Sequence, residues 1–171
     1  DQSQRPIVAQ IYGKTPEFFR QVTILVCQLG FDGVDINMGC PAKNVAASGS
    51  GAALIQNPKL ALEIIKAAQL GVKDWLDGKT VSDCPNLSQK IIAEVELRTK
   101  LLKLDKQRSI PISVKTRIGY SDPTVEEWIK TLLEANPAAI AIHGRTLKQG
   151  YGGLANWEEI ARGVATARAN Q

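Results

Sequence analysis

Hydrophobic positions along the chain fall into four short apolar runs, each followed by a pattern that is typical of an amphipathic helix. The runs are short and continuous rather than alternating, which favours buried strands of a parallel sheet. Repeated β-then-α units predict an α/β fold with right-handed crossovers. The four apolar runs occupy residues 6–11, 33–37, 112–115 and 139–143.

Helix start signals accompany the runs. After the first run, Thr15 is a natural N-cap with Pro16 at the first helical position, and apolar residues then recur at helical spacing until Gly30. A loop rich in Gly, Ser and Ala, residues 39–51, separates the second run from its helix. The later helices are predicted from Asn57-Pro58, from Thr124 with Glu127, and from Asn156 with Glu159.

One stretch interrupts the alternation of predicted strands and helices. Residues 71–109 lie between a predicted helix and the next strand, where connections usually take roughly 2 to 6 residues. They contain a polar loop, 74–85, and a second helical pattern from residue 87 to about 106. We interpret the stretch as an insertion whose extra helix packs on the outside of the fold, with a nucleic-acid contact or a subunit surface as alternatives. On a helical wheel one face of this helix carries Leu87, Ile91, Val95 and Leu102.

Composition narrows the class of protein. The chain has 171 residues, of which 44% are hydrophobic and 22% charged, as in ordinary soluble globular domains. No apolar run approaches the roughly 18 residues of a membrane span, and the start of the chain lacks the pattern of a signal peptide. We therefore expect a cytoplasmic protein without a membrane partner. Because the chain lacks an initiator Met and a clear end signal, we also expect a piece of something longer.

Cysteine and histidine usage limits the chemistry. Cys27, Cys40 and Cys84 are widely spaced and form no Cys-x-x-Cys pair, which disfavours a disulfide framework and a zinc ribbon. A single histidine, His143, argues against a multi-histidine metal site. The net charge of +4 is compatible with a polyanionic partner but is far below that of a dedicated nucleic-acid domain.

Polar side chains stand at the carboxyl end of every predicted strand, where parallel α/β folds place their chemistry. Neither a Gly-x-Gly-x-x-Gly nor a Walker A sequence follows these strands, so a barrel is favoured over a doubly wound nucleotide-binding sheet. The strand ends carry Gln10, then Asn37 and Cys40, then Lys115 and Arg117, and finally His143 and Arg145.

Four segments of the chain form a recognisable set. Residues 34–43 read VDINMGCPAK, with GAAL at 51–54; the others are AQIYG at 9–13, VKTRIG at 114–119, and HGRT at 143–146 with QGY at 149–151. In their order along the chain, these segments resemble those of the tRNA-dihydrouridine synthases, over most of residues 6–160. The resemblance implies part of a TIM (β/α)8 barrel, and four units are about half of a barrel that takes roughly 250 residues. The other strands, and the helical tRNA-binding domain that follows the barrel in this family, are expected to be absent.

The resemblance also implies an activity with definite chemical demands. Enzymes of this family reduce the 5,6 double bond of particular tRNA uridines with FMN, which NADPH recharges. The reaction needs a hydride at C6 and a proton at C5, so a flavin stacks on one face of the base and an acid stands on the other. Cys40 resembles the family's acid, because a thiol is mostly protonated at neutral pH and can donate.

The other strand-end residues receive roles from the same resemblance. Lys115 is expected beside the flavin ring, where a positive charge stabilises the reduced form. Gln10 and His143 are expected as further FMN contacts, and Asn37 as the residue that holds the uracil edge through its amide.

Other charged residues near the strand ends are expected to contact the substrate. Arg145 is expected to contact tRNA or cofactor, and Lys43 the tRNA backbone. Arg117 has two open interpretations, a substrate phosphate or the acidic strand residue Asp35. The residues expected to pack within the fold are Cys27, Trp75, Trp128 and Trp157.

Two other functions stay open at this point. A related FMN barrel, such as a dihydroorotate or dihydropyrimidine dehydrogenase, would use similar flavin contacts on a free pyrimidine, although the Cys-Pro-Ala-Lys loop argues against it. A non-catalytic tRNA-binding module would keep the fold without the flavin. Because the phosphate-binding loops after barrel strands seven and eight lie outside this chain, we expect the isolated chain to bind FMN poorly and to be inactive.

Overall fold

A parallel sheet forms the centre of the computed structural model, which describes residues 2–104 and 107–170. Its strands are β1 (Val8–Ile11), β2 (Gly33–Met38), β3 (Ile112–Arg117) and β4 (Ala139–His143). They lie side by side in the order β1-β2-β3-β4, and every neighbouring pair is parallel. Parallel strands in sequence order, alternating with helices, are the arrangement of consecutive units of a (β/α)8 barrel, which confirms the predicted fold class.

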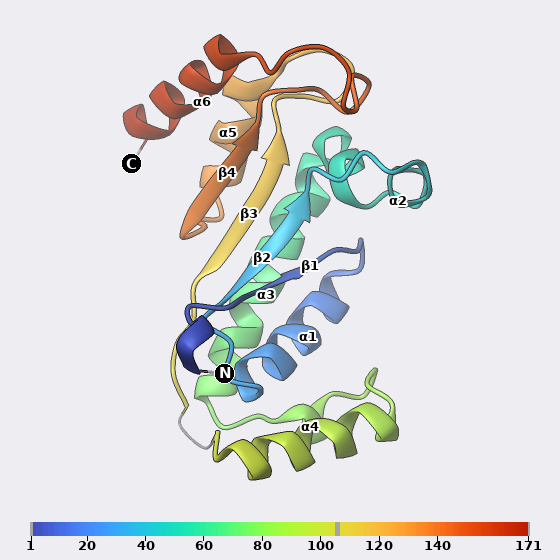
Figure 1. Ribbon diagram of the computed structural model, residues 1–171, viewed down its shortest axis with the longest axis vertical. Helices are drawn as coiled ribbons and strands as arrows, with labels where there is room; N and C mark the ends of the chain where they lie inside the picture. The colour runs from blue at the N-terminus through green and yellow to red at the C-terminus, as the bar shows by residue number, and fades with distance from the viewer. Residues whose placement is uncertain (1, 105–106, 171) are drawn as a thin grey trace.

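Helices cover one face of this sheet (Figure 1). They are α1 (Pro16–Gln28), α3 (Pro58–Leu76), α5 (Val125–Leu133) and α6 (Trp157–Ala169). Ile36 of β2 and Val114 of β3 are fully buried in the core between the sheet and these helices. In the part of the chain that the structure describes, no helix combines the length and the apolar character needed to cross a membrane.

Two of the four predicted N-caps act through their side chains. The side-chain oxygens of Asn57 and Asn156 each accept a hydrogen bond from the backbone N–H three residues later, at 3.3 and 3.1 Å. Thr15 and Thr124 also precede their helices as predicted, but their side chains make no capping bond within the described residues. The pattern therefore located all four helix starts, while only the asparagines supply the capping contact.

Two of the three tryptophans are core residues as predicted. Trp75 and Trp128 are 5% and 3% exposed, and Cys27 on α1 is also buried. Trp157 is 75% exposed, so its predicted packing role is wrong. It is the first residue of α6, whose buried positions, Gly163 and Thr166, lie farther along the helix.

The extra segment between α3 and β3 starts later than predicted. Helix α3 continues to Leu76, so residues 71–76 belong to it, and the polar loop that follows contains the 3-10 turn η3 (Val81–Asp83). Helix α4 (Gln89–Leu102) comes next and ends at Lys103, whose backbone is left-handed at φ 52°. The predicted helix ran to about residue 106, and residues 105 and 106 lie outside the described residues.

Helix α4 buries only part of the apolar face seen on the helical wheel. Of that face, Val95 is buried and Leu87 packs against its cluster, whereas Ile91 and Leu102 are 43% and 65% exposed. Ile92, which was not in that set, is buried with Val95 and with Val81 of η3. Because apolar residues surround this helix, the helical wheel alone did not determine which of them would meet the rest of the fold.

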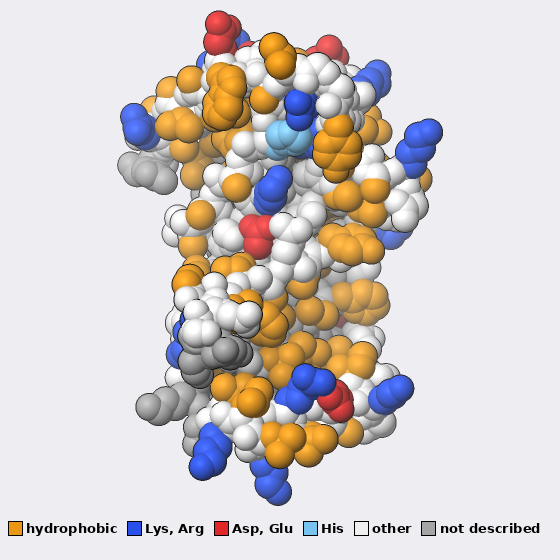
Figure 2. All heavy atoms as spheres, in the orientation of Figure 1, with side chains coloured by type: hydrophobic (Ala, Val, Ile, Leu, Met, Phe, Trp, Pro, Cys, Tyr) orange, Lys and Arg blue, Asp and Glu red, His pale blue; other side chains and the backbone are white. Residues whose placement is uncertain are grey.

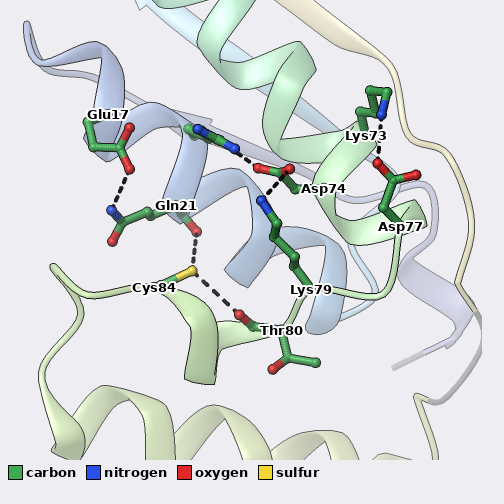
Figure 3. A network of polar contacts seen from close by, with 9 residues as sticks. Glu17, Gln21, Lys73, Asp74, Asp77, Lys79, Thr80 and Cys84 are labelled. Atoms are coloured by element: carbon green, nitrogen blue, oxygen red, sulfur yellow. Dashed lines mark hydrogen bonds and ion pairs between the residues drawn. The ribbon is translucent and has the colours of Figure 1, made fainter.

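Ion pairs tie the polar loop before α4 to the helices of the core (Figure 3). The nearly buried carboxylate of Asp74 accepts hydrogen bonds from Arg20 Nε at 2.5 Å and from Lys79 Nζ at 2.8 Å. The bond from Arg20 is the main reason that the pKa of Asp74 lies below its usual range. Cys84, to which the sequence assigned no role, is buried beside this network with its sulfur 3.5 Å from the Thr80 carbonyl oxygen.

A second carboxylate closes the end of the sheet where the strands begin. Asp32 Oδ1 accepts from Arg5 Nη1 at 2.7 Å and from Arg108 Nη2 at 2.8 Å, and Oδ2 accepts from the Ile7 amide at 2.7 Å. The Ile7 amide, followed by Arg108, lowers the pKa of Asp32 to about 2. Helix α4 lies at this same lower end in Figure 1, so the extra segment is remote from the carboxyl ends of the strands.

Candidate active site

The strand-end residues predicted to form the site share the sheet face that the described helices leave uncovered. Gln10 lies opposite Asp35, and Asn37 lies opposite Lys115. Directly opposite residues project from the same face of a sheet, and alternate residues on one strand do so as well, which adds His143 of β4. Figure 2 shows this face, where basic side chains and the single histidine gather near the upper ends of the strands.

The amide of Asn37 holds the loop that follows β2. Its Oδ1 accepts hydrogen bonds from the backbone N–H groups of Gly39 and Cys40, at 3.1 and 2.9 Å. Its Nδ2 donates to Gln10 Oε1 at 3.0 Å, and Gln10 Nε2 donates to Asp35 Oδ2 at 2.7 Å. Because the oxygen of Asn37 is engaged by the loop, a contact to a uracil edge would have to use the second hydrogen of Nδ2.

Cys40 is fixed by its backbone on both sides. The Asn37 side chain holds its amide, and its carbonyl oxygen accepts from the Ala52 amide at 3.2 Å. The thiol is partly accessible, whereas Cys27 and Cys84 are 5% and 1% exposed. Of the three cysteines, all of which the structure describes, Cys40 is therefore the one available to a ligand.

The close approach around Cys40 depends on glycine at position 51. A Cβ at Gly51 would lie 2.9 Å from the Cys40 carbonyl oxygen and 3.1 Å from the Cys40 Cβ, and the backbone there has φ +61°. Only glycine adopts this conformation without strain. The GAAL segment thus packs directly against the Cys40 loop through η2 (Gly51–Gln56).

Positive charge surrounds a neutral histidine at the carboxyl ends of β3 and β4. Burial lowers the pKa of His143, and Arg117, Lys115 and Arg145 lower it further. Arg145 Nη1 lies 3.4 Å from His143 Nε2, and since a guanidinium only donates, this nitrogen of the histidine is an acceptor. Arg145 is held in turn by the Gly153 carbonyl oxygen, 2.8 Å from its Nη2.

Asp35 is the acidic side chain of this face, and its bonds do not go to arginine. It accepts from Gln10 Nε2 and from Ser113 Oγ, each at 2.7 Å. The interpretation that Arg117 pairs with Asp35 is therefore wrong: Arg117 Nε instead donates to the Gly39 carbonyl oxygen at 2.7 Å. The guanidinium lies closer to the loops above the sheet than to the middle of the strands, where Asp35 stands.

The loops around these strand ends expose basic and aromatic side chains. Lys43 is exposed at the first residue of α2 (Lys43–Ala47), a short helix within the segment predicted as a continuous loop. Tyr12, Tyr151 and Trp157 are 65%, 79% and 75% exposed in the loops or at the helix start after β1 and β4. Sequence reasoning did not place these aromatic residues at the site, since exposure depends on how each loop folds.

Comparison with known proteins decides which family has this arrangement. The family model described as Dihydrouridine synthase (Dus) matches residues 1–81 and 85–164. The chain belongs to the dihydrouridine synthase family. The resemblance seen in the four sequence segments is thereby confirmed. The matched residues include α4, and the break at 82–84 covers the last two residues of η3 and Cys84.

Curated relatives of this chain are found in bacteria. It is 36% identical over 160 residues to the probable tRNA-dihydrouridine synthase 2 of Bacillus subtilis, covering 93% of this chain and 38% of that protein. It is 35% identical over 158 residues to the probable tRNA-dihydrouridine synthase of Staphylococcus epidermidis, covering 92% and 37%. The corresponding values for the Staphylococcus aureus protein are 34% over 160 residues, 93% and 38%. The chain thus spans less than two fifths of the length of these relatives.

Proposed function

We propose that the protein to which this chain belongs reduces the 5,6 double bond of specific uridines in tRNA to dihydrouridine, with FMN as cofactor and NADPH as electron donor. The observation that carries the proposal is the placement of the Cys40 thiol at the end of β2, beside the uncovered face that holds Lys115 and His143. Membership in the dihydrouridine synthase family supports the substrate class.

The donor set on the uncovered face fits a flavin. Beyond its bonds to Asp35 and Asn37, Gln10 keeps one hydrogen of Nε2 and one lone pair of Oε1 for an imide edge, Lys115 is a cation, and His143 stands among cations that lower its pKa. The one carboxylate of this face among the described residues, Asp35, accepts from Gln10 and Ser113. Nearer the carboxyl ends of the strands the charged side chains are the cations Lys115 and Arg145. FMN bound here would supply the hydride for C6 of the uracil.

Cys40 supplies the proton in this proposal. Its thiol donates the S–H proton to C5 of the base, which completes the addition of one hydride and one proton across the double bond, and the thiolate that results regains a proton from solvent. Hydrogen bonds to the Asn37 side chain and to the Ala52 amide hold the backbone that carries this thiol. Lys115 stabilises the electron-rich ligand without taking part in proton transfer.

Recognition of tRNA would use the loops at the same end. Lys43 and Arg145 lie on the two sides of the strand ends and are proposed to contact tRNA phosphates. Exposed Tyr12 and Tyr151 are available to stack on bases, which favours an RNA over a free pyrimidine as the substrate.

The test is a cysteine substitution in the intact protein. Cys40→Ala should lower the rate of dihydrouridine formation in unmodified tRNA by about 10²-fold or more, with FMN content and its reduction by NADPH unchanged. Cys84→Ala, which removes a buried cysteine remote from the site, is the matched control and should keep the rate. A normal rate in Cys40→Ala would contradict the acid assignment, and reduction of free pyrimidines in place of tRNA would favour the dehydrogenase-like alternative.

A further inference from the structure

Arg117 is a buried cation whose partners are carbonyl groups. Its side chain is almost fully enclosed, with the residue 2% exposed. Nε donates to the Gly39 oxygen at 2.7 Å, and Nη1 donates to the oxygens of Thr146 and Gly150 at 3.0 and 2.9 Å. Burial lowers the pKa of Arg117, and the ring of Tyr151 lies 5.8 Å from the guanidinium carbon.

These carbonyl groups belong to two loops that are remote in the sequence. Gly39 immediately precedes Cys40, whereas the other two acceptors lie in the turn after β4. That turn is closed by its own bonds, since Gln149 Oε1 accepts from the Thr146 amide at 2.8 Å. Arg117 therefore connects two separately formed loops above the carboxyl ends of β2 and β4.

The geometry of an arginine is needed for this connection. A guanidinium is planar, and its N–H groups diverge in fixed directions, so one side chain reaches carbonyl groups on two sides. A lysine would keep the charge but has a single donor centre. Removing a buried charge from water is costly unless its donors are satisfied, so the enclosed Arg117 favours the state in which both loops are in place.

We propose that Arg117 is a positioning residue that holds the Cys40 loop and the 146–151 turn in one fixed arrangement. The acid and the exposed Tyr151 then keep a constant separation on either side of the substrate. The catalytic part of this inference rests on the proposed function, whereas the connection between the loops does not.

Hydrogen exchange tests the connection independently of activity. The variants are Arg117→Lys and Arg117→Met in the intact protein, with Arg98→Met, an exposed arginine of α4, as control. In both Arg117 variants the amides of Gly39, Cys40, Thr146 and Leu147 should exchange at least about tenfold faster, with the amides of β3 unchanged. Unchanged exchange in either loop of the lysine variant would overturn the proposal.

A measurement on the unaltered protein covers the case in which the variants do not fold. Native-state exchange at increasing urea should show the Cys40 and Leu147 amides opening in one event, with the same free energy and the same urea dependence. Separate opening of the two loops would show that Arg117 does not unite them.

Kinetics test the effect on the reaction. Both Arg117 variants should lower kcat for tRNA reduction by about 10²-fold, with the KM for tRNA and flavin reduction by NADPH each within about threefold of the unaltered enzyme. If charge alone mattered, the lysine variant would keep kcat, and this result would overturn the positioning role. If the unaltered protein made no dihydrouridine, the proposed function would fail while the exchange experiment still decided the connection between the loops.

Discussion

Replacing Gly51 by alanine should disturb Cys40 through a direct contact. The backbone of Gly51 has φ +61°, and an added Cβ would lie 2.9 Å from the Cys40 carbonyl oxygen, 3.0 Å from Val45 Cγ1 and 3.1 Å from the Cys40 Cβ. An ordinary contact begins at 3.4 Å, so the carbonyl group would have to move by about 0.5 Å. This displacement acts on the residue whose thiol we propose as the acid.

Gly49 offers a matched control in the same loop. Its backbone has φ +81°, and the nearest atom to an added Cβ is Lys14 Cδ at 3.7 Å, which is an ordinary contact. Both substitutions therefore carry the left-handed strain of about 1–2 kcal/mol, partly offset by the lower entropy of the unfolded chain, but Gly51→Ala adds the cost of overpacking. Gly49→Ala should lower the free energy of unfolding by about 1 kcal/mol, and Gly51→Ala by about 2–4 kcal/mol.

Two assays distinguish backbone strain at the substituted glycine from displacement of Cys40. Urea unfolding of the intact protein gives the stability difference between the two variants. The rate of dihydrouridine formation should fall about tenfold in Gly51→Ala, since a 1 Å misplacement costs about 10²-fold, and should stay within about twofold in Gly49→Ala. Equal stability and equal rates in the two variants would refute the reasoning, because they would mean that the contact with Cys40 is absent or easily relieved.

Three further outcomes follow from the structure. Ile92→Ala should lower the free energy of unfolding by about 2–5 kcal/mol and Ile91→Ala by less than about 1 kcal/mol, because only Ile92 is buried. Similar losses for the two variants in urea unfolding would contradict the packing of α4 described above. Asp32→Asn should flatten the loss of stability as pH falls from about 4 toward about 2 in acid unfolding curves. A carboxylate with a lowered pKa stabilises the fold above its unfolded pKa and loses that effect as pH falls through the folded pKa, so an unchanged curve would contradict the lowered pKa of Asp32. His143 should titrate below its usual pKa range when its ring nitrogens are followed by nitrogen-15 NMR, and a pKa at or above that range would contradict the neutral assignment.

Hydrophobic periodicity was sufficient for the sheet but not for α4. A buried strand such as β2 combines apolar residues with flanking turn residues, so few alternatives compete with it. Helix α4 has exposed Ile91 and Leu101 as well as buried Ile92, and its packing partner Val81 lies in a loop that carries no periodic signal. Which of its apolar residues are buried depends on tertiary contacts, so the helical wheel included buried Val95 but grouped it with exposed Ile91 and left out buried Ile92.

In the candidate site, too, the sequence predicted the strand positions but not the loop contacts. The sequence predicted that Gln10, Lys115 and His143 stand at the carboxyl ends of strands, and the pairing register of the parallel strands puts them on one face. The bonds of Asn37 and Arg117 to loop backbone carry no such signal, since they depend on how the loops after β2 and β4 fold.

Charge is arranged differently at the two ends of the sheet. At the end where strands begin, Asp32 is matched by two arginines, and Asp74 on α3 is paired with Arg20 and Lys79. At the carboxyl ends, among the described residues, neither Lys115 nor Arg145 forms an ion pair with a carboxylate. Matched charges stabilise a fold without a ligand, whereas cations gathered around a neutral histidine lower their mutual repulsion only when an anion binds. The charges at the end where the strands begin therefore stabilise the fold, and those at the carboxyl ends are compatible with the anionic ligand that we propose; added salt should weaken binding of such a ligand.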